Sequence, residues 1–287
     1  MGMARSRDGT RIAYTQRGSG PPVLLVDGAF DHRGVGTSQQ LAELLASHFK
    51  VITYDRRGRG DSGNARLYSV DREVEDIAAL IATAGGTVSL YGASSGAALA
   101  LEATRRGLNI RKLALYEPPF VVDSTRPPVP PDLTTRLQAL IKAGKRGAAV
   151  RLFLRVAGVP AMLIALLRLT RTWRKLIQVA HTLVYDAAIM SGDQGGNPLS
   201  AGRWSSVTLP TLVMGGGNSP QWMRNAIAAL LQALPNARFQ QLPGEKHRVS
   251  PEAIAPALRE FFGRLTPEEL PFLRQRYAAG GTAPWTR

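Results

Sequence analysis

The segment of residues 92–96, with the sequence GASSG, constrains the fold of this chain more than any other stretch. An apolar run, residues 87–91, precedes it, and a run of small and apolar residues, 97–103, follows it. This order predicts a strand, a tight turn and a helix, with a serine at the apex above a parallel sheet. A side chain at either glycine would strike the neighbouring strand or helix, and the apex backbone is strained. The pattern predicts Ser94 as a nucleophile; the alternative is a Gly- and Ser-rich turn that only connects two elements.

Strands and helices alternate through the first part of the chain. We expect an N-terminal hairpin at residues 5–17, strands at 23–26, 51–54, 87–91 and 113–116, and helices at 38–48, 70–84 and 96–106. Continuously apolar runs such as VLLV suit strands buried on both faces, and the alternation implies parallel pairing with helices on both faces of the sheet. Reactive groups in such sheets gather at the carboxyl ends of strands, where Asp27, Asp55, Ser94 and Glu117 stand.

The alternation stops at a proline-rich linker, residues 123–131, after which the chain is predicted to be purely helical from Leu133 to about Met190. Residues 156–167 are uncharged and mostly apolar, but a bilayer span needs about 20 residues. We interpret this part as a helical cap whose apolar face closes over the site. Ordinary packing within a helix bundle and an interfacial membrane helix are the alternatives.

The core resumes after the cap, and the chain divides into four parts. We expect strands at 211–214 and 238–242 and helices at 221–233 and 251–264. The predicted division is residues 1–122 for the first half of the core, 123–205 for the cap, 206–265 for the second half of the core and 266–287 for a C-terminal tail, which leaves room for one more helix. The fold class is therefore α/β, a mostly parallel central sheet with helices on both faces and an inserted helical cap.

The net charge of +15 comes from 36 basic and 21 acidic residues, and the arginines are scattered along the sequence. Because no basic patch interleaved with aromatic residues is evident, we do not expect a nucleic-acid partner, while an attraction to anionic substrates or membrane surfaces stays open. The chain has no cysteine, which removes thiol chemistry and disulfides and fits a reducing compartment. The N-terminus lacks the apolar core of a signal peptide, so a cytoplasmic location without an integral membrane segment is expected.

The chain carries no Walker loop, dinucleotide fingerprint or metal-ligand cluster, so we expect no cofactor and no metal. A serine nucleophile instead needs a base to take its proton and a third group to orient that base. Of the four histidines, only His247 lies on a Gly-x-x-His turn after the final strand, and we predict it as the base. His32 and His181, together with Asp27 and Phe30, are candidates to line a substrate pocket.

These motifs, taken together, resemble those of the α/β-hydrolase superfamily over residues 5–263. The resemblance rests on five pieces in the same order: Asp27-Gly28 where the family usually has His-Gly, the run Tyr54 to Ser62 (YDRRGRGDS), the turn at Ser94, the strand Pro210 to Met214 (PTLVM), and Gly244-x-x-His247. The resemblance implies a fold and a nucleophile but not a substrate, because this fold hosts many chemistries. We expect the run after Tyr54 to fix a loop beneath the pocket, with Arg56 or Arg57 neutralising a buried carboxylate.

The chain departs from the family where most members carry an aspartate, because Asn218 and Ser219 stand there. In this respect the chain is similar to some superfamily members, including certain dehalogenases, in which the acid lies at the end of the preceding core strand. That position holds Glu117, which we predict as the acid. The alternatives are a Glu117 that only pairs with an arginine, or a site without any acid; Asp27, a third candidate, is expected to organise the oxyanion loop instead.

The resemblance also implies that the backbone N–H groups of Ala29 and Ser95 form the oxyanion hole. The chain is then expected to be a serine hydrolase that cleaves an ester, thioester or lactone with an apolar portion through an acyl-Ser94 intermediate. Its partner would be a small apolar substrate, and assembly into a homo-oligomer is left open. The alternatives are a carbon–carbon hydrolase or lyase that uses the same three residues, and a non-catalytic protein that binds an apolar ligand.

Overall fold

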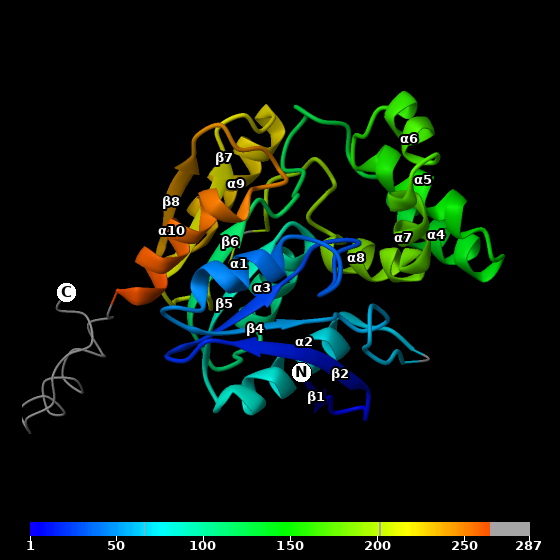
Figure 1. The fold of residues 1–287 in the computed structure, drawn as a ribbon. Helices are drawn as coiled ribbons and strands as arrows, with labels where there is room; N and C mark the ends of the chain where they lie inside the picture. The colour runs from blue at the N-terminus through cyan, green and yellow to red at the C-terminus, as the bar shows by residue number, and fades with distance from the viewer. Residues whose placement is uncertain (66, 201, 265–287) are drawn as a thin grey trace, which may run out of the picture.

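The computed structural model describes residues 1–65, 67–200 and 202–264. Its centre is one eight-stranded sheet in the order β1-β2-β4-β3-β5-β6-β7-β8 (Figure 1). The first two strands are antiparallel to their neighbours, and every other pairing is parallel. The strands are β1 (Gly2–Arg5), β2 (Arg11–Arg17), β3 (Pro22–Val26), β4 (Lys50–Tyr54), β5 (Val88–Ala93), β6 (Ile110–Tyr116), β7 (Thr211–Gly216) and β8 (Ala237–Leu242).

Alternation of side chains along the strands creates two separate cores, one on each face of the sheet. Leu24 faces one core together with apolar side chains of α2 (Val70–Ala84), α3 (Ser95–Arg105) and α9 (Gln221–Ala233). Val23 and Leu25 face the other core, which α1 (Ser38–Leu45) and α10 (Pro251–Gly263) cover. Because both faces are covered, the buried strands can be apolar throughout, as the sequence predicted.

The inserted helices lie between β6 and β7 and stand beside the sheet in Figure 1. They are α4 (Leu133–Lys142), α5 (Arg146–Val156), α6 (Ala161–Leu167), α7 (Arg171–Gln178), the 3-10 helix η1 (Ala180–Thr182) and α8 (Leu183–Met190). Gly158, with φ of +88°, follows α5 and lets the chain turn into Pro160, which precedes α6. The predicted fold class, including the helical cap, is confirmed.

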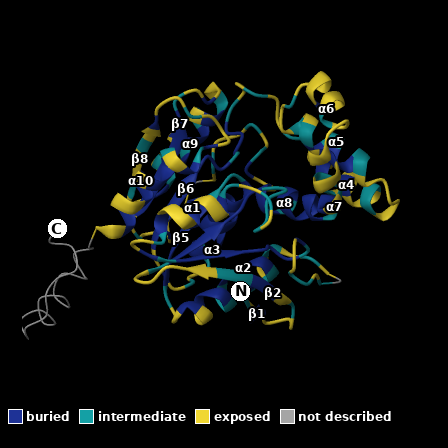
Figure 2. Cartoon of the chain, in the orientation of Figure 1, coloured by how far each residue is buried: buried dark blue, intermediate teal, exposed yellow. Residues whose placement is uncertain are grey.

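Burial differs along the cap. Figure 2 shows α8 dark blue against the core, whereas α6 at the outer end is largely exposed. In the part of the chain that the structure describes, no helix has the length and apolar character needed to cross a membrane. The predicted C-terminal tail, residues 266–287, lies outside the described residues, and the boundaries proposed for the four parts of the chain remain a prediction.

Candidate active site

The turn between β5 and α3 places Ser94 in a backbone conformation that few residues adopt. Its φ and ψ are 55° and −126°, and its N–H donates to Tyr116 O at 2.9 Å. A Cβ on Gly92 would lie 2.4 Å from Gly96 O, and one on Gly96 would lie 2.3 Å from Val26 O. Only glycine fits at these two positions, so the steric reason inferred from the sequence is confirmed.

The ring of His247 lies between Ser94 and Glu117. His247 Nε2 is 3.0 Å from Ser94 Oγ, and His247 Nδ1 is 2.9 Å from Glu117 Oε2. A carboxylate at this distance favours the tautomer with the proton on Nδ1, in which Nε2 can accept a hydrogen bond from the hydroxyl of Ser94. The three predicted residues, 153 positions apart in sequence at the widest, are thus brought into one hydrogen-bonded chain.

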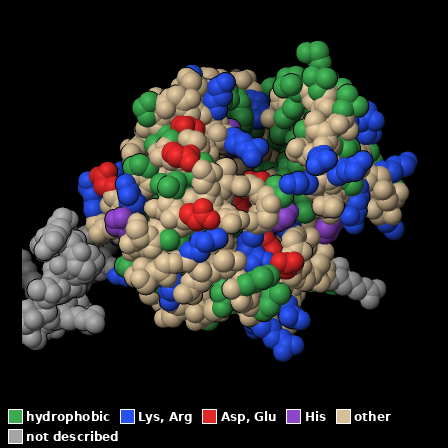
Figure 3. All heavy atoms as spheres, in the orientation of Figure 1, with side chains coloured by type: hydrophobic (Ala, Val, Ile, Leu, Met, Phe, Trp, Pro, Cys, Tyr) green, Lys and Arg blue, Asp and Glu red, His purple; other side chains and the backbone are tan. Residues whose placement is uncertain are grey.

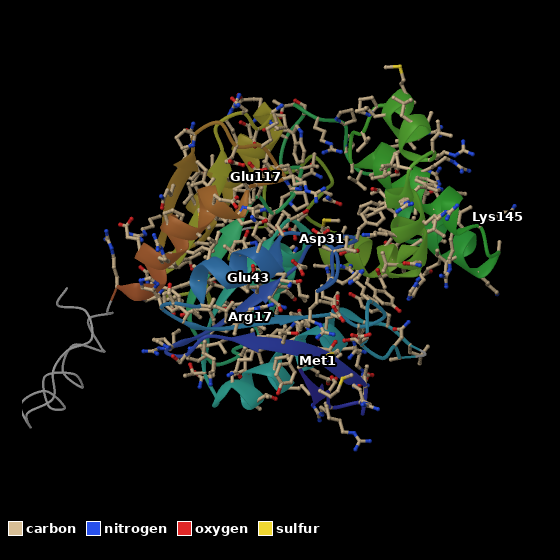
Figure 4. The ribbon with its side chains drawn as sticks, viewed as in Figure 1. Met1, Arg17, Asp31, Glu43, Glu117 and Lys145 are labelled. Atoms are coloured by element: carbon tan, nitrogen blue, oxygen red, sulfur yellow. The ribbon has the colours of Figure 1, made fainter. Side chains whose placement is uncertain are left out.

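Glu117 is fully buried at the end of β6, between the ends of the neighbouring strands (Figure 4). Its backbone has a φ of 45°, a left-handed conformation that turns the chain sharply after Tyr116. Its second oxygen, Oε1, accepts from the N–H of Gly216 at 2.8 Å and from the hydroxyl of Ser219 at 2.5 Å. Three donors therefore hold both oxygens of this carboxylate, and none of them is the arginine that the alternative interpretation required.

Sequence reasoning missed the contact made by Ser219. This side chain is buried and stands at one of the two positions where an aspartate was sought. Asn218, the other position, donates its side-chain amide to Gly244 O at 3.0 Å, on the turn that leads to His247. The sequence did contain a signal for this contact, because Ser219 stands where an aspartate was expected and Glu117 ends the neighbouring strand. Two carboxylates at these positions would repel each other, whereas a hydroxyl can donate to the glutamate.

The loop after β3 passes directly against the nucleophile. A Cβ on Gly28 would lie 3.1 Å from Ser94 Cβ and 3.7 Å from its Oγ. Arg59 donates to Gly28 O at 2.5 Å, and the carbonyl of Gly28 belongs to the same peptide unit as the N–H of Ala29. Because the two groups of a trans peptide point in opposite directions, Arg59 also fixes the direction of the Ala29 N–H. Ser95 heads α3, where the first amides have no intrahelical acceptor, so both predicted oxyanion donors border Ser94.

A buried cluster of charges lies beneath this loop and joins the core to the cap. Asp186 of α8 is fully buried and accepts from Arg56 at 2.8 Å, from Arg59 at 2.7 Å and from the hydroxyl of Ser95 at 2.7 Å. Burial alone would raise the pKa of Asp186, but the charges of Arg59 and Arg56 and its hydrogen bonds hold it below the ordinary value. Asp186 of the cap thus contacts the hydroxyl of Ser95, whose N–H is one predicted oxyanion donor. It also contacts Arg59, which binds the peptide unit that carries the other donor.

The same run of arginines neutralises further buried carboxylates, as predicted. Arg56 binds Glu73 with two hydrogen bonds, of 2.9 and 2.7 Å, and Arg57 binds Asp76 with two, both of 2.7 Å. The bidentate geometry suits a guanidinium opposite a carboxylate. Asp186 was the missed partner, because it lies 127 residues beyond Arg59 and nothing in its own surroundings in the sequence marks it.

The four predicted pocket residues take different positions. Phe30 is half-buried and packs edge-on against Phe153 of α5, with ring centroids 5.5 Å apart, so it joins the loop after β3 to the cap. Asp27 is buried and hydrogen-bonds to Ser38 at the start of α1. His32 lines a separate cavity of about 360 Å³, whose lining residues do not include Ser94. His181 lies in η1 against the turn at Gly58.

Two acidic side chains near the loop after β3 have raised pKa values. Burial, and next the charge of Asp31, raise the pKa of Asp27 from 3.8 to about 7. Burial also raises the pKa of Asp31 to about 6, although Arg248 and Arg59 act in the opposite direction. Asp31 lies on the loop between the sheet and the cap (Figure 4). Among the residues that the structure describes, no group of three or more His, Cys, Asp or Glu side chains is placed to bind a metal ion.

Known proteins match this chain in both sequence and fold. A family model described as the alpha/beta hydrolase family matches residues 14–257. A solved alpha/beta hydrolase from Sphaerobacter thermophilus DSM 20745 is 50% identical, with a TM-score of 0.84 over 91% of this chain and 100% of that chain. The enol-lactonase from Burkholderia xenovorans LB400 is 19% identical, with a TM-score of 0.66 over 92% of this chain and 100% of that one, and this likeness concerns the fold alone.

Curated proteins match this chain over a shorter region. The uncharacterized hydrolase YraK of Bacillus subtilis (strain 168) is 37% identical over 101 residues, which are 33% of this chain and 35% of that protein. The match thus spans about a third of the length of such curated relatives.

Proposed function

The chain belongs to the alpha/beta hydrolase family, and we propose that it is a serine hydrolase of ester-type bonds: an ester, thioester or lactone with an apolar portion. The observation that supports this proposal is the position of the His247 ring, 3.0 Å from Ser94 Oγ and 2.9 Å from Glu117 Oε2. In this proposal Ser94 is the nucleophile, His247 the base and Glu117 the orienting acid, with His247 within hydrogen-bond reach of both other residues.

In the first half of the proposed reaction, Ser94 Oγ attacks the carbonyl carbon of the substrate while His247 Nε2 takes the hydroxyl proton. The carbonyl oxygen becomes an oxyanion, to which the N–H groups of Ala29 and Ser95 donate. His247 then gives its proton to the leaving group, and the acyl group stays on Ser94. Glu117 stabilises the imidazolium that exists between these two proton transfers.

In the second half, a water molecule attacks the acyl-Ser94 carbonyl and gives a proton to His247 Nε2. Collapse of the second oxyanion breaks the bond to Ser94 Oγ, which recovers the proton from His247, and the acid product leaves. The residue that acted as base acts as acid in each half, so the enzyme returns to its starting protonation state.

The preference for an apolar portion rests on the surface between core and cap. Figure 3 shows this face hollowed between the sheet and the cap, with hydrophobic side chains on the cap side. The Phe30–Phe153 pair bridges the two parts near the loop that borders Ser94. Aromatic and aliphatic walls favour an acyl or alkyl group over a strongly hydrated one.

Hydrolysis of p-nitrophenyl acetate, butyrate and octanoate tests the proposal. We expect turnover of at least one ester and its loss in both Ser94→Ala and His247→Ala, with folding verified by circular dichroism. Ser191→Ala, on an exposed turn, is the matched control and should keep full activity. Unchanged turnover in Ser94→Ala would contradict the proposal, as would no turnover of any ester, thioester or lactone offered.

A further inference from the structure

Helix α6 combines an entirely apolar sequence with a mostly exposed surface. Its seven residues, AMLIALL, contain no polar side chain, and only Ile164 is buried. An apolar helix in a water-soluble protein is normally covered on all sides. Most side chains that follow the Pro160 turn are exposed to solvent, and closure of residues 156–167 over the site remains a prediction.

The exposed side chains form one continuous strip, which we call the α6 ridge. Its members are Met162, Leu163, Leu166 and Leu169, with exposed fractions of 73%, 52%, 54% and 86%. Figure 3 shows hydrophobic side chains gathered at the outer end of the cap, where Figure 1 places α6. Contiguous exposed apolar surface of this kind marks a site that binds a protein, a membrane or a ligand.

Basic residues precede and follow the α6 ridge in the sequence. Residues 133–185 contain ten Lys and Arg and no Asp or Glu, so this segment carries two thirds of the net charge of +15 of the chain. This segment of the cap therefore carries charge of one sign, although the arginines are scattered along the whole sequence. The basic rim, as we call it, consists of the exposed basic residues nearest to the ridge in sequence: Arg155, Arg168, Arg171, Arg174 and Lys175.

We propose that the α6 ridge and the basic rim form a docking surface for a lipid membrane that carries anionic headgroups. The leucine and methionine side chains enter the boundary between headgroups and acyl chains, and the rim contacts the phosphates. Apolar insertion and charge attraction together suffice for reversible peripheral binding, which needs no spanning helix. This inference does not depend on the proposed esterase reaction.

The chemistry of the surface favours a membrane over two other partners. A nucleic acid would meet the basic rim, but the centre of the surface is aliphatic, and bases stack on aromatic side chains or hydrogen-bond to polar ones. A second copy of the chain would cover the α6 ridge, but it would place two basic rims with no acidic residue against each other. An anionic bilayer complements both the apolar centre and the positive edge.

Co-sedimentation of the full chain with vesicles tests the proposal. One set of vesicles contains equal parts of phosphatidylcholine and phosphatidylglycerol, and the other contains phosphatidylcholine alone. We expect binding to the anionic vesicles, with weaker binding to the neutral ones and at higher salt. The variant Arg171→Gln/Arg174→Gln should weaken binding about tenfold or more, because each basic residue near an anionic surface contributes on the order of fivefold. Leu166→Ser/Leu169→Ser should weaken binding at least as much.

Matched controls come from elsewhere on the core. Leu67→Ser removes an 81% exposed leucine far from the ridge in sequence, and Arg5→Gln/Arg11→Gln removes two exposed arginines that face each other across β1 and β2. Both controls should bind like the parent chain. The proposal is overturned if the chain ignores anionic vesicles, if the ridge variant binds as well as the Leu67 control, or if light scattering shows a dimer that the ridge leucines hold together.

Discussion

The hydroxyl of Ser219 donates a hydrogen bond of 2.5 Å to Glu117 Oε1, so a serine after β7 supports a carboxylate at the end of β6. The other oxygen of the same carboxylate faces His247. Ser219, at a position where an aspartate was expected, therefore still contacts the group that binds the histidine. It provides a donor to an acid on the neighbouring strand, and the histidine has a carboxylate partner in either arrangement.

Replacing Glu117 by glutamine should lower kcat/KM for an ester by about 10³- to 10⁴-fold, because the imidazolium loses its counter-charge and the ring its fixed tautomer. The side chain is buried, so the midpoint of thermal unfolding must be measured on the same preparation. Glu43→Gln, on the exposed side of α1, is the control and should change neither quantity. Full activity in a folded Glu117→Gln protein would mean that Glu117 is not the acid.

Replacing Ser219 by alanine removes one of the three donors to Glu117 while the Gly216 N–H remains. We expect kcat to fall about tenfold with little change in KM, since one hydrogen bond to a charged group contributes roughly 1.5–3 kcal/mol and part of this is recovered by relaxation. Asn218→Ala tests the neighbouring position, which bonds to Gly244 O and not to the carboxylate. An equal effect of both substitutions on kcat would show that the contact between Ser219 and Glu117 has no special role.

Asp186→Asn should destabilise the fold by about 3–5 kcal/mol, because it leaves the buried Arg59 without a carboxylate partner. Urea denaturation followed by circular dichroism measures this loss. Asp132→Asn breaks an exposed pair with Arg136 of 3.8 Å and should cost less than about 1 kcal/mol. Similar losses for the two variants would contradict the proposed role of Asp186 in joining cap to core.

The raised pKa of Asp27 predicts how stability changes with pH. Between pH 4 and 7 the folded chain keeps a proton on Asp27 that the unfolded chain releases, so the free energy of unfolding falls as pH rises through this range. Asp27→Asn cannot ionise and can still accept from Ser38. The parent chain should therefore lose about 3 kcal/mol more than this variant between pH 5 and 8. Parallel pH profiles of the two proteins would show that burial does not hold Asp27 protonated.

Much of the core could be predicted because its signals are local. The strand ends, the glycines around Ser94 and the Gly-x-x-His turn all depend on residues close together in sequence. The predicted bounds of α2 and α9 agree with the structure, and those of β5 and α3 differ by one or two residues. The proposal of Glu117 as the acid also used a local signal, a carboxylate that directly follows a buried strand.

What could not be predicted depends on contacts between distant segments. Asp186 meets Arg59 because α8 packs on α3 and carries a carboxylate from the cap into the core. His32, on the loop after β3, lines a cavity whose lining residues do not include Ser94. His181, in the cap, lies against the turn at Gly58. The exposure of α6 was also out of reach, because apolar composition alone does not tell whether a helix packs inward or faces outward.

Reaction with a fluorophosphonate probe, followed by peptide mass spectrometry, shows whether Ser94 is an activated nucleophile. We expect that the probe modifies Ser94, that labelling disappears in Ser94→Ala and His247→Ala, and that it slows strongly in Glu117→Gln. A chain that stays unlabelled would contradict the claim that Ser94 is an activated nucleophile. Labelling at the same rate without His247 would contradict it equally, because the hydroxyl would then react without the base that the structure places 3.0 Å away.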